Sequence, residues 1–370
     1  MQFIDLKRQY ELIKEDVDKG IQNVLEHGRY INGPEITELE QKLAEFAGTK
    51  YSIACSSGTD ALIIPLMAWG IGPGDAVFTT PFTFIATAEV IKLVGATPVF
   101  VDIDPYTYNM DPKKLDEAIH KTKREGKLNP KAIIPVDLFG LPADYAKIEE
   151  VALHYGMVVL EDAAQGFGGN IDLKRSGSFG DAASTSFFPA KPLGCYGDGG
   201  AIFTDDDTLY SKMLSIRVHG MGDVPYTHVR IGLNGRLDSI QAAVLLSKLN
   251  IFEEELLKRD NVAKMYTEVL KDKFAAPTVP EGYFSAWAQY CILAKDEAHR
   301  TESRNKLSDN NIPSAVYYPI PLHLQKAFAD LEYRKGDFPV SEEMCQRIFA
   351  LPMHPYLTSE EVNQIAEVLI

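Results

Sequence analysis

The sequence predicts an α/β protein: a large domain built on a mostly parallel sheet with helices on both faces, and a smaller α+β domain after it. The first observation is that short, nearly continuous apolar runs alternate with helical patterns over residues 51–162. Strands of this kind are typical of parallel sheets buried on both faces. The second observation is the length of 370 residues, which exceeds what a single hydrophobic core usually supports. We therefore expect domains at 1–245 and 246–370.

The expected elements follow one another along the chain. Residues 34–48 place apolar side chains at spacings of three and four between Pro34 and Gly48, which predicts an amphipathic helix. Strand patterns follow as Y-S-I-A-C-S, A-V-F-T-T, P-V-F-V-D-I-D, A-I-I-P-V-D-L-F and M-V-V-L-E-D. A long charged helix is predicted from about residue 253, with the strand W-A-Q-Y-C-I-L-A and a C-terminal helix beyond it. Functional side chains are expected at the carboxyl ends of the parallel strands.

Charge and cysteine usage argue against several classes of function. The formal net charge of −15 opposes binding to nucleic acid phosphates or to an anionic membrane surface. The cysteines lie far apart without a C-x-x-C pair, so they predict neither a metal site nor a disulfide framework. They are Cys55, Cys195, Cys291 and Cys345. The sequence shows no signal-peptide pattern and no apolar run approaching ~20 residues, so we expect a soluble, cytoplasmic protein.

Asp162 is the first candidate site residue. It ends the strand pattern M-V-V-L-E-D, where an α/β sheet presents functional side chains, although a lone carboxylate there could equally cap the next helix. Earlier, C-S-S-G-T-D-A-L runs from a strand into a helix, so Gly58 and Thr59 offer backbone N–H groups, a hydroxyl and the positive end of a helix dipole. This pattern indicates a phosphate site, with an ordinary helix cap by Ser57 or Thr59 as the alternative.

Lys191 has unusual surroundings for a lysine. It lies in S-F-F-P-A-K-P-L-G-C-Y-G-D-G-G-A, among aromatic residues, prolines and glycines, and Ser186 precedes it by five residues. P-F-T-F adds Phe82 and Phe84 on a strand-to-helix turn. A phosphate site, an aromatic face, an acid and a lysine are what pyridoxal 5′-phosphate (PLP) requires. The lysine forms a Schiff base with the aldehyde, and the acid keeps the pyridine nitrogen protonated.

Seven short motifs occur in order along the chain. They are F-I-D-L-K-R-Q-Y, Y-I-N-G-P-E-I-T-E-L-E, S-S-G-T-D-A-L, P-F-T-F-I-A-T, E-D-A-A-Q-G-F-G, the lysine motif and N-G-R-L-D-S-I-Q-A-A. Together they make the chain resemble, from end to end, the sugar aminotransferases of the DegT/DnrJ/EryC1 family, which have the fold type I, aspartate aminotransferase-like architecture. The resemblance implies a seven-stranded, mostly parallel sheet, PLP as cofactor, and a homodimer with two shared active sites.

The resemblance also implies roles for individual residues. Lys191 would be the lysine that binds the cofactor, and Asp162 would face the pyridine nitrogen. Gln165 would lie near the ring hydroxyl of the cofactor and Phe84 would stack on the ring. The implied phosphate contacts are Gly58, Thr59 and Ser186, with Asn234 reaching the phosphate of the partner subunit's cofactor.

The implied substrate is a nucleotide sugar. K-P-L-G-C-Y-G-D-G-G and V-Y-Y-P-I-P-L-H resemble family members that aminate C3 of a UDP-linked 3-keto-N-acetylglucosaminuronate, with L-glutamate as donor, for bacterial surface polysaccharide such as the O-antigen of lipopolysaccharide. Arg236 would pair with the uronate carboxylate in a bidentate fork, and an ion pair at the dimer interface is its structural alternative. The implied sugar contacts are Gly28, Tyr30, Arg236, Tyr317 and Tyr318.

Two residues depart from this subgroup. Ala190 and Tyr317 stand where the subgroup commonly has serine before the lysine and histidine before the tyrosine. Recognition of the sugar is therefore expected to differ in detail. His219 and His323 are further pocket candidates, although a lone histidine is more often packed or on the surface.

Other functions account for the sequence less well. The nearest alternative is an aminotransferase for another UDP- or dTDP-linked 3-keto or 4-keto sugar, because the motifs leave the keto position and the 6-substituent open. Sugar 3-dehydratases of the same fold have histidine in place of the lysine, which Lys191 opposes. A non-catalytic regulator is disfavoured by the acidic charge and the absence of an appended DNA-binding segment. A nicotinamide oxidoreductase would need G-x-G-x-x-G, which G-D-G-G is not.

Overall fold

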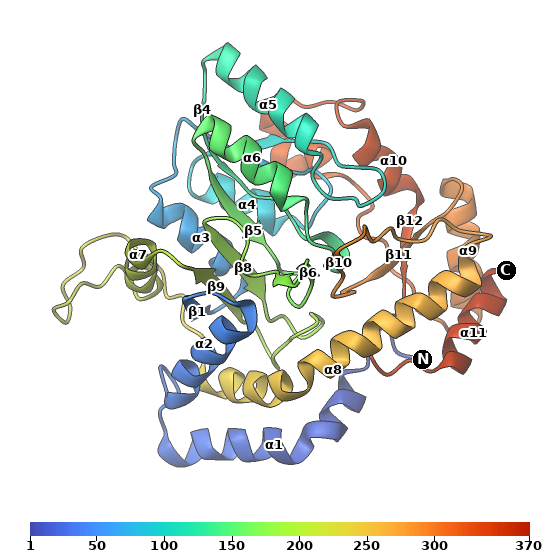
Figure 1. Cartoon of the computed structure of the whole chain (residues 1–370), viewed down its shortest axis with the longest axis horizontal. Helices are drawn as coiled ribbons and strands as arrows, with labels where there is room; N and C mark the ends of the chain where they lie inside the picture. The colour runs from blue at the N-terminus through green and yellow to red at the C-terminus, as the bar shows by residue number, and fades with distance from the viewer.

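A computed structural model describes all 370 residues, and its main sheet has the predicted α/β architecture (Figure 1). Seven strands lie in the order β1-β9-β8-β5-β4-β2-β3, and only β9 runs antiparallel to its neighbours. The prediction of a mostly parallel, seven-stranded sheet is confirmed. The bounds are β1 Tyr51–Cys55, β2 Asp75–Thr79, β3 Thr97–Phe100, β4 Asn129–Ile133, β5 Val158–Asp162, β8 Ala182–Ser186 and β9 Gly200–Thr204.

Helices cover both faces of this sheet, because successive strand residues point to opposite sides. Ala132 of β4 and Ile134, which follows the strand, pack with α3, α4 and α7, whereas Ile133 packs with α5 and α6 on the other face. Helix α2 covers that second face nearer β1. The predicted helix at 34–48 is confirmed as α2, which ends at Gly48 with a positive φ of 80°. The bounds are α2 Pro34–Ala47, α3 Gly58–Ala68, α4 Ala86–Leu93, α5 Pro112–Glu125, α6 Tyr145–Tyr155 and α7 Asp207–Arg217.

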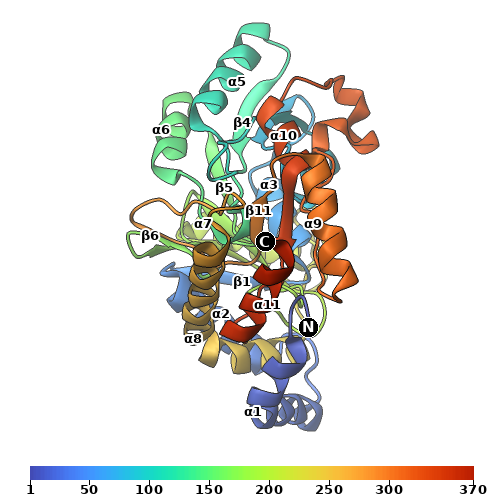
Figure 2. The ribbon, with the colours of Figure 1, turned by 90° about the vertical axis from the view of Figure 1, so that its right-hand side faces the viewer.

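Helix α8 (Ser239–Leu270) connects the two cores of the molecule. Its first half packs on the sheet beside α2, and its last turns pack against β11, β12 and α11 (Figure 2). The predicted boundary at residue 245 lies inside this helix, so the division at that residue stays a prediction. The C-terminal elements are β10 Tyr283–Phe284, β11 Tyr290–Leu293, α9 Glu297–Asp309, α10 Pro339–Arg347, β12 Ile348–Leu351 and α11 Ser359–Leu369.

Two segments extend from this body. Helix α1 (Leu6–His27) lies along α8 at the bottom of Figure 1. The segment after α7 projects from the left side in that view. Its apolar side chains are exposed at Val224, Tyr226, Val229 and Ile231. The short strands β6 (Asn170–Ile171) and β7 (Lys174–Arg175) pair beside β10. None of the helices combines the length and the apolar character needed to span a bilayer.

Candidate active site

The residues of the predicted phosphate site lie where β1 and β8 end. Helix α3 begins at Gly58, and Ser57 caps it by accepting a hydrogen bond from Asp60 N at 3.0 Å. The Thr59 hydroxyl therefore does not serve as the cap, and the first N–H groups of the helix have no helical partner. A Cβ atom on Gly58 would lie 2.6 Å from the Cβ of Ser186, so only glycine lets the two segments meet. The structure thus brings Gly58, Thr59 and Ser186 together at an anion-attracting helix terminus.

Asp162, which is buried, and Lys191, which is half-buried, lie within electrostatic range of each other. Asp162 is the last residue of β5 and is 4% exposed. Its carboxylate accepts hydrogen bonds from Thr87 Oγ1 at 2.8 Å and from Ala164 N at 3.1 Å. Burial raises the pKa of Asp162 and lowers the pKa of Lys191, and the charge of each partly opposes the shift of the other. Each charge thus acts on the other, and the roles predicted for Asp162 and Lys191 stay predictions. The sequence pattern did not predict the contact of Asp162 with Thr87.

Gln165 and Tyr318 lie in direct contact. Gln165 Nε2 donates to the Tyr318 hydroxyl at 3.1 Å, and Gln165 Oε1 accepts from Phe139 N at 2.7 Å. The Tyr318 ring packs edge-on against Phe82, with centroids 6.2 Å apart. Tyr318, predicted as a sugar contact, thus also holds the amide predicted to face the cofactor. Nothing in sequence spacing could reveal a contact across 153 residues.

The two phenylalanines of the P-F-T-F turn separate into different environments. Phe82 is fully buried and packs edge-on against Phe139, whereas Phe84 is 56% exposed. Phe84 is therefore the one of the two with an exposed ring, and its stacking on the cofactor stays a prediction. Tyr317 is half-buried and packs against Phe3, with ring centroids 6.5 Å apart.

The remaining predicted residues form the rim near α8. Arg236 Nη2 donates to Asn234 Oδ1 at 2.7 Å, and the Nε of Arg236 is buried without a partner. Gly28 ends α1 with a φ of 69°, and two residues later the carbonyl of Tyr30 accepts from Ser239 N at 2.9 Å. This arrangement gathers both rim segments at the start of α8.

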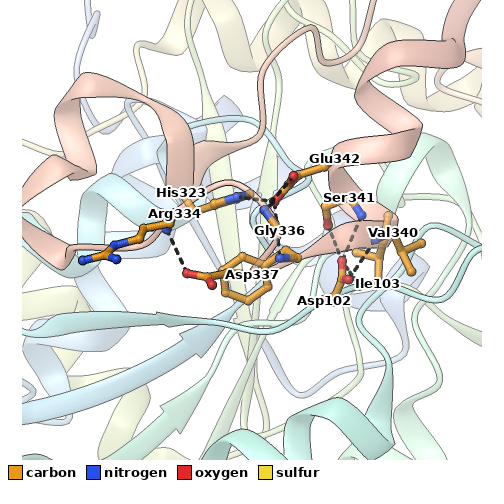
Figure 3. A network of polar contacts seen from close by, with 10 residues as sticks. Asp102, Ile103, His323, Arg334, Gly336, Asp337, Val340, Ser341 and Glu342 are labelled. Atoms are coloured by element: carbon orange, nitrogen blue, oxygen red, sulfur yellow. Dashed lines mark hydrogen bonds and ion pairs between the residues drawn. The ribbon is translucent and has the colours of Figure 1, made fainter.

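The two histidine candidates have different surroundings. His219 is exposed on the projecting segment. His323 is buried, and its Nε2 lies 3.0 Å from Glu342 Oε1 in a network of polar contacts (Figure 3). In the same network the carboxylate of Asp102, just after β3, accepts from Val340 N and Ser341 N at the start of α10. These contacts fasten the C-terminal segment to the carboxyl edge of the sheet.

Lys248 is a buried lysine, which the sequence pattern did not reveal. It lies on α8 at 1% exposure, and its amine sits 4.4 Å from the centroid of the Tyr196 ring without a hydrogen-bond partner. Burial lowers the pKa of Lys248 to about 8. Inside a helical pattern such a lysine looks like any surface residue, so only packing identifies it.

The donor set fits PLP. The cradle at Gly58 and Ser186 leaves N–H and hydroxyl groups for a phosphate, and the buried carboxylate of Asp162 lies within electrostatic range of Lys191. A lysine amine that loses its proton readily and a buried acid are what a pyridine aldehyde needs for covalent attachment and for protonation of its ring nitrogen.

Comparison with known proteins agrees with this geometry. The family model of the DegT/DnrJ/EryC1/StrS aminotransferases matches residues 11–370. The chain is 50% identical over 370 residues to the UDP-2-acetamido-2-deoxy-3-oxo-D-glucuronate aminotransferase of Pseudomonas aeruginosa, covering 100% of this chain and 99% of that protein. A crystal structure of a DegT/DnrJ/EryC1/StrS aminotransferase from Brucella abortus superposes with a TM-score of 0.97 at 52% identity, covering 100% and 98% of the two chains.

A further neighbour was solved with its cofactor. NtdA from Bacillus subtilis, with bound PMP, the amino form of PLP, superposes with a TM-score of 0.91 at 31% identity, covering 100% of this chain and 84% of that one. Together with the family match, this neighbour makes PLP the cofactor of the chain. The protein is a member of the DegT/DnrJ/EryC1/StrS family of PLP-dependent sugar aminotransferases.

Proposed function

We propose that this enzyme transfers an amino group from L-glutamate to C3 of a UDP-linked 3-keto-2-acetamido-2-deoxyglucuronic acid. The observation that carries the reaction class is the pair of buried Asp162 and half-buried Lys191 beside a helix terminus with free N–H groups. The substrate rests on the 50% identity, over the whole chain, to a protein named for that activity. The product would enter bacterial surface polysaccharide, such as the O-antigen of lipopolysaccharide.

The residues have distinct tasks in this proposal. Bound PLP supplies the electron-accepting ring, and Lys191 holds it covalently and then moves a proton at the substrate carbon. The carboxylate of Asp162 keeps a positive charge at the pyridine nitrogen, and Thr87 and Ala164 orient that carboxylate. Phe84 covers one face of the ring. The partial burial of Lys191 lowers the pKa of its amine, which favours the neutral, nucleophilic form.

The sugar would lie over the rim. Arg236 has a buried Nε without a partner, and a uronate carboxylate is an acceptor that a guanidinium binds through two parallel hydrogen bonds. The other proposed sugar contacts are Gly28, Tyr30, Tyr317 and Tyr318. Because Tyr318 already binds Gln165, the sugar site and the cofactor site would share a wall.

The proposal includes a homodimer in which each subunit completes the other's site. The projecting segment exposes Tyr226 at 94% and Ile231 at 84%. Ile231 also borders a pocket of about 540 Å³ in which nine of eleven lining residues are hydrophobic. Apolar surface of this kind indicates a protein contact, and a second copy of the chain is the partner we propose. Asn234 at the base of this segment would then reach the partner's phosphate site.

The cytoplasm is the proposed location. All four cysteines are free and buried, which suits a compartment that keeps thiols reduced.

The test is a coupled assay of the purified enzyme with L-glutamate and a panel of UDP- and dTDP-linked 3-keto and 4-keto sugars. The uronate should have the highest kcat/KM. Preference for a 6-deoxy sugar would contradict the substrate and leave the aminotransferase class intact. Failure of the half-reaction with glutamate in the PLP-loaded enzyme would contradict the donor.

A further inference from the structure

A second pair of carboxyl groups lies behind Asp162, and the proposed chemistry leaves it without a task. Asp137 follows β4, and Glu161 immediately precedes Asp162 on β5. Both side chains are 0% exposed, and they bind successive residues of one loop. The Ser176 hydroxyl donates to Asp137 Oδ2 at 2.7 Å and Gly177 N donates to Glu161 Oε1 at 2.8 Å, which brings the two carboxyl groups together. The pair thus links two neighbouring strands of the sheet one residue away from the proposed catalytic carboxylate.

Every other hydrogen bond to Asp137 comes from a neutral donor. Its Oδ1 accepts from Ala143 N at 3.0 Å and from the Tyr145 hydroxyl at 2.8 Å. Its Oδ2 accepts only from the Ser176 hydroxyl, at 2.7 Å. Oδ2 therefore keeps a lone pair for a further donor, and the contact with Glu161 is where that donor would come from.

Glu161 is also surrounded by neutral donors. Its two oxygens accept from Gly177 N and Phe179 N, each at 2.8 Å. Both donors are neutral backbone N–H groups. The hydrogen bonds of Glu161 therefore bring no cation to balance its charge. The other titratable groups that face the pair are Tyr145, Tyr283 and Asp162, of which the first two are neutral at physiological pH.

Two ionised carboxylates cannot remain in contact in such a place. Burial disfavours each charge, and the repulsion between two like charges at contact distance adds to that cost. Burial, and for Glu161 also the charge of Asp137, raises the pKa of the pair. Carboxyl pairs in this situation hold one proton between them.

Asp137 is joined to the active site through its backbone and through close packing. Asp137 N donates to the carbonyl of Asp162 at 3.0 Å. A Cβ atom on Gly166 would lie 2.2 Å from the Cβ of Asp137, so the turn that follows Asp162 rests directly on this side chain. Gln165 lies within that turn.

We propose that Asp137 and Glu161 share one proton at neutral pH. The proton-linked pair holds two strands together, and it carries one negative charge where full ionisation would give two. As positioning residues, the pair supports the turn from Asp162 to Gln165. Because the pair carries one negative charge and not two, it repels the ionised Asp162 carboxylate less strongly. The proton sharing rests on the burial and the hydrogen bonds of the two side chains and does not depend on the proposed function. The positioning of catalytic groups rests on the proposed function.

Asp137→Asn is the variant that separates charge from shape. The amide oxygen still accepts from Ala143 and Tyr145, and the new NH₂ group donates to Glu161 and to the Ser176 hydroxyl, which rotates to accept. Hydrogen bonds and net charge of the pair are preserved, but its shared proton is gone. Glu161→Gln is the variant that should disrupt the hydrogen bonds. Its amide NH₂ group would face the N–H group of Gly177 or Phe179, and two donors cannot bind each other.

The proton is measured without any assay of the enzyme. Infrared difference spectroscopy of wild type against Asp137→Asn at neutral pH should show the carbonyl stretch of a protonated carboxyl group in wild type only. Because the folded pKa is raised, the wild-type free energy of unfolding should fall as pH rises above the ordinary carboxyl pKa, until the pair loses its proton. That fall should be smaller in Asp137→Asn. A wild-type spectrum without the band would overturn the proposal.

The positioning role is tested by comparing how strongly each variant weakens PLP binding and lowers kcat. Asp137→Asn should keep the dissociation constant for PLP and kcat within about threefold of wild type, and Asp137→Ala should weaken both about tenfold or more, the loss expected when buried donors are left unpaired. Glu161→Gln should resemble Asp137→Ala. Equal impairment of Asp137→Asn and Asp137→Ala would overturn the positioning role, even in an enzyme whose glutamate half-reaction proceeds.

Discussion

Lys191 is half-buried and Lys248 is fully buried; both have a lowered pKa, but their surroundings differ. Lys191 faces the carboxylate of Asp162 beside the phosphate cradle. Lys248 lies over the Tyr196 ring with no acceptor for its protons. A low pKa alone therefore does not make a lysine the cofactor's anchor, because an aldehyde held by its phosphate reaches only the nearer amine.

Borohydride reduction of the PLP-loaded enzyme should fix the cofactor on Lys191 and leave Lys248 unlabelled. Peptide mass mapping after digestion reads out the position. Lys191→Ala should abolish turnover with the fold intact by circular dichroism, and Lys248→Met is the control that should keep the label on Lys191. Label on Lys248 in wild type would contradict the assignment.

Asp162→Ala should lower kcat/KM by about 100- to 1,000-fold, or roughly 3 to 4 kcal/mol, the loss expected when one preorganised electrostatic partner is removed. Asp162→Asn should fare little better, because an amide cannot balance a protonated pyridine nitrogen. Thr87→Val removes only one hydrogen bond to that carboxylate and should cost about 1 kcal/mol. A near-normal rate in Asp162→Asn would leave the residue a structural role only.

Arg236→Ala should remove most of the discrimination between the uronate and its 6-deoxy analogue. In wild type the analogue would leave the guanidinium unpaired, at a cost on the order of 2 to 5 kcal/mol. The variant should use the uronate poorly and keep the half-reaction with glutamate. Both half-reactions are compared by stopped-flow absorbance; equal loss in the two would assign Arg236 to glutamate or to the dimer interface.

Helix α10 shows how an element can depend on a distant residue for its start. Phe338 precedes the helix and provides no side-chain cap. The cap comes from Asp102, whose carboxylate accepts from Val340 N at 3.0 Å and from Ser341 N at 3.0 Å (Figure 3). Nearby, Leu322 N donates to the carbonyl of Pro81 at 2.8 Å. The chain from 317 to 342 is thereby held against the turn that carries Phe84.

Asp102→Ala should lower the free energy of unfolding by about 1 to 3 kcal/mol, because it removes a helix cap and leaves buried N–H groups unpaired. It should also raise the KM for the nucleotide sugar, since the loosened segment carries Tyr317 and Tyr318. Urea denaturation and steady-state kinetics measure the two effects. Asp111→Ala is the matched control: Asp111 caps α5 locally, so its loss should reduce stability and spare KM.

At the scale of the whole molecule, α8 is the element that ties the parts together. Its first half belongs to the core under the sheet and its last turns to the C-terminal core. The rim with Asn234 and Arg236 lies just before this helix, and the projecting segment lies just before the rim. A contact between two copies through that segment would therefore be transmitted directly to the proposed sugar site.

Mixing Lys191→Ala and Asn234→Ala chains tests whether sites are shared. If Asn234 completes the partner's site, each hybrid dimer has one intact site, and a statistical mixture recovers about a quarter of wild-type activity after refolding together. If Asn234 serves its own site, the hybrid gains nothing above the Asn234→Ala parent. Size-exclusion chromatography with light scattering checks that the mixture is dimeric; a monomeric active wild type would contradict the shared site.

The α/β class and the helix at 34–48 could be predicted from the sequence. The same is true of the candidates Lys191, Asp162 and the turn at Gly58. These depend on local patterns: apolar periodicity, a helix start after a strand, and a lysine among apolar neighbours. The long charged helix was recognised only from about residue 253, although α8 begins at Ser239, because its first turns are buried and lack a polar face.

The contacts between residues far apart in the chain could be identified only in the folded structure. These include the hydrogen bond of Gln165 to Tyr318, the capping of α10 by Asp102, and the carboxyl pair of Asp137 and Glu161. Each depends on how strands and loops are placed in space, which no local period encodes. Burial also lowers the pKa of Lys248, a second lysine with a low pKa. This effect cannot be predicted from the sequence, because a charge without a partner becomes costly only when packing has removed the water around it.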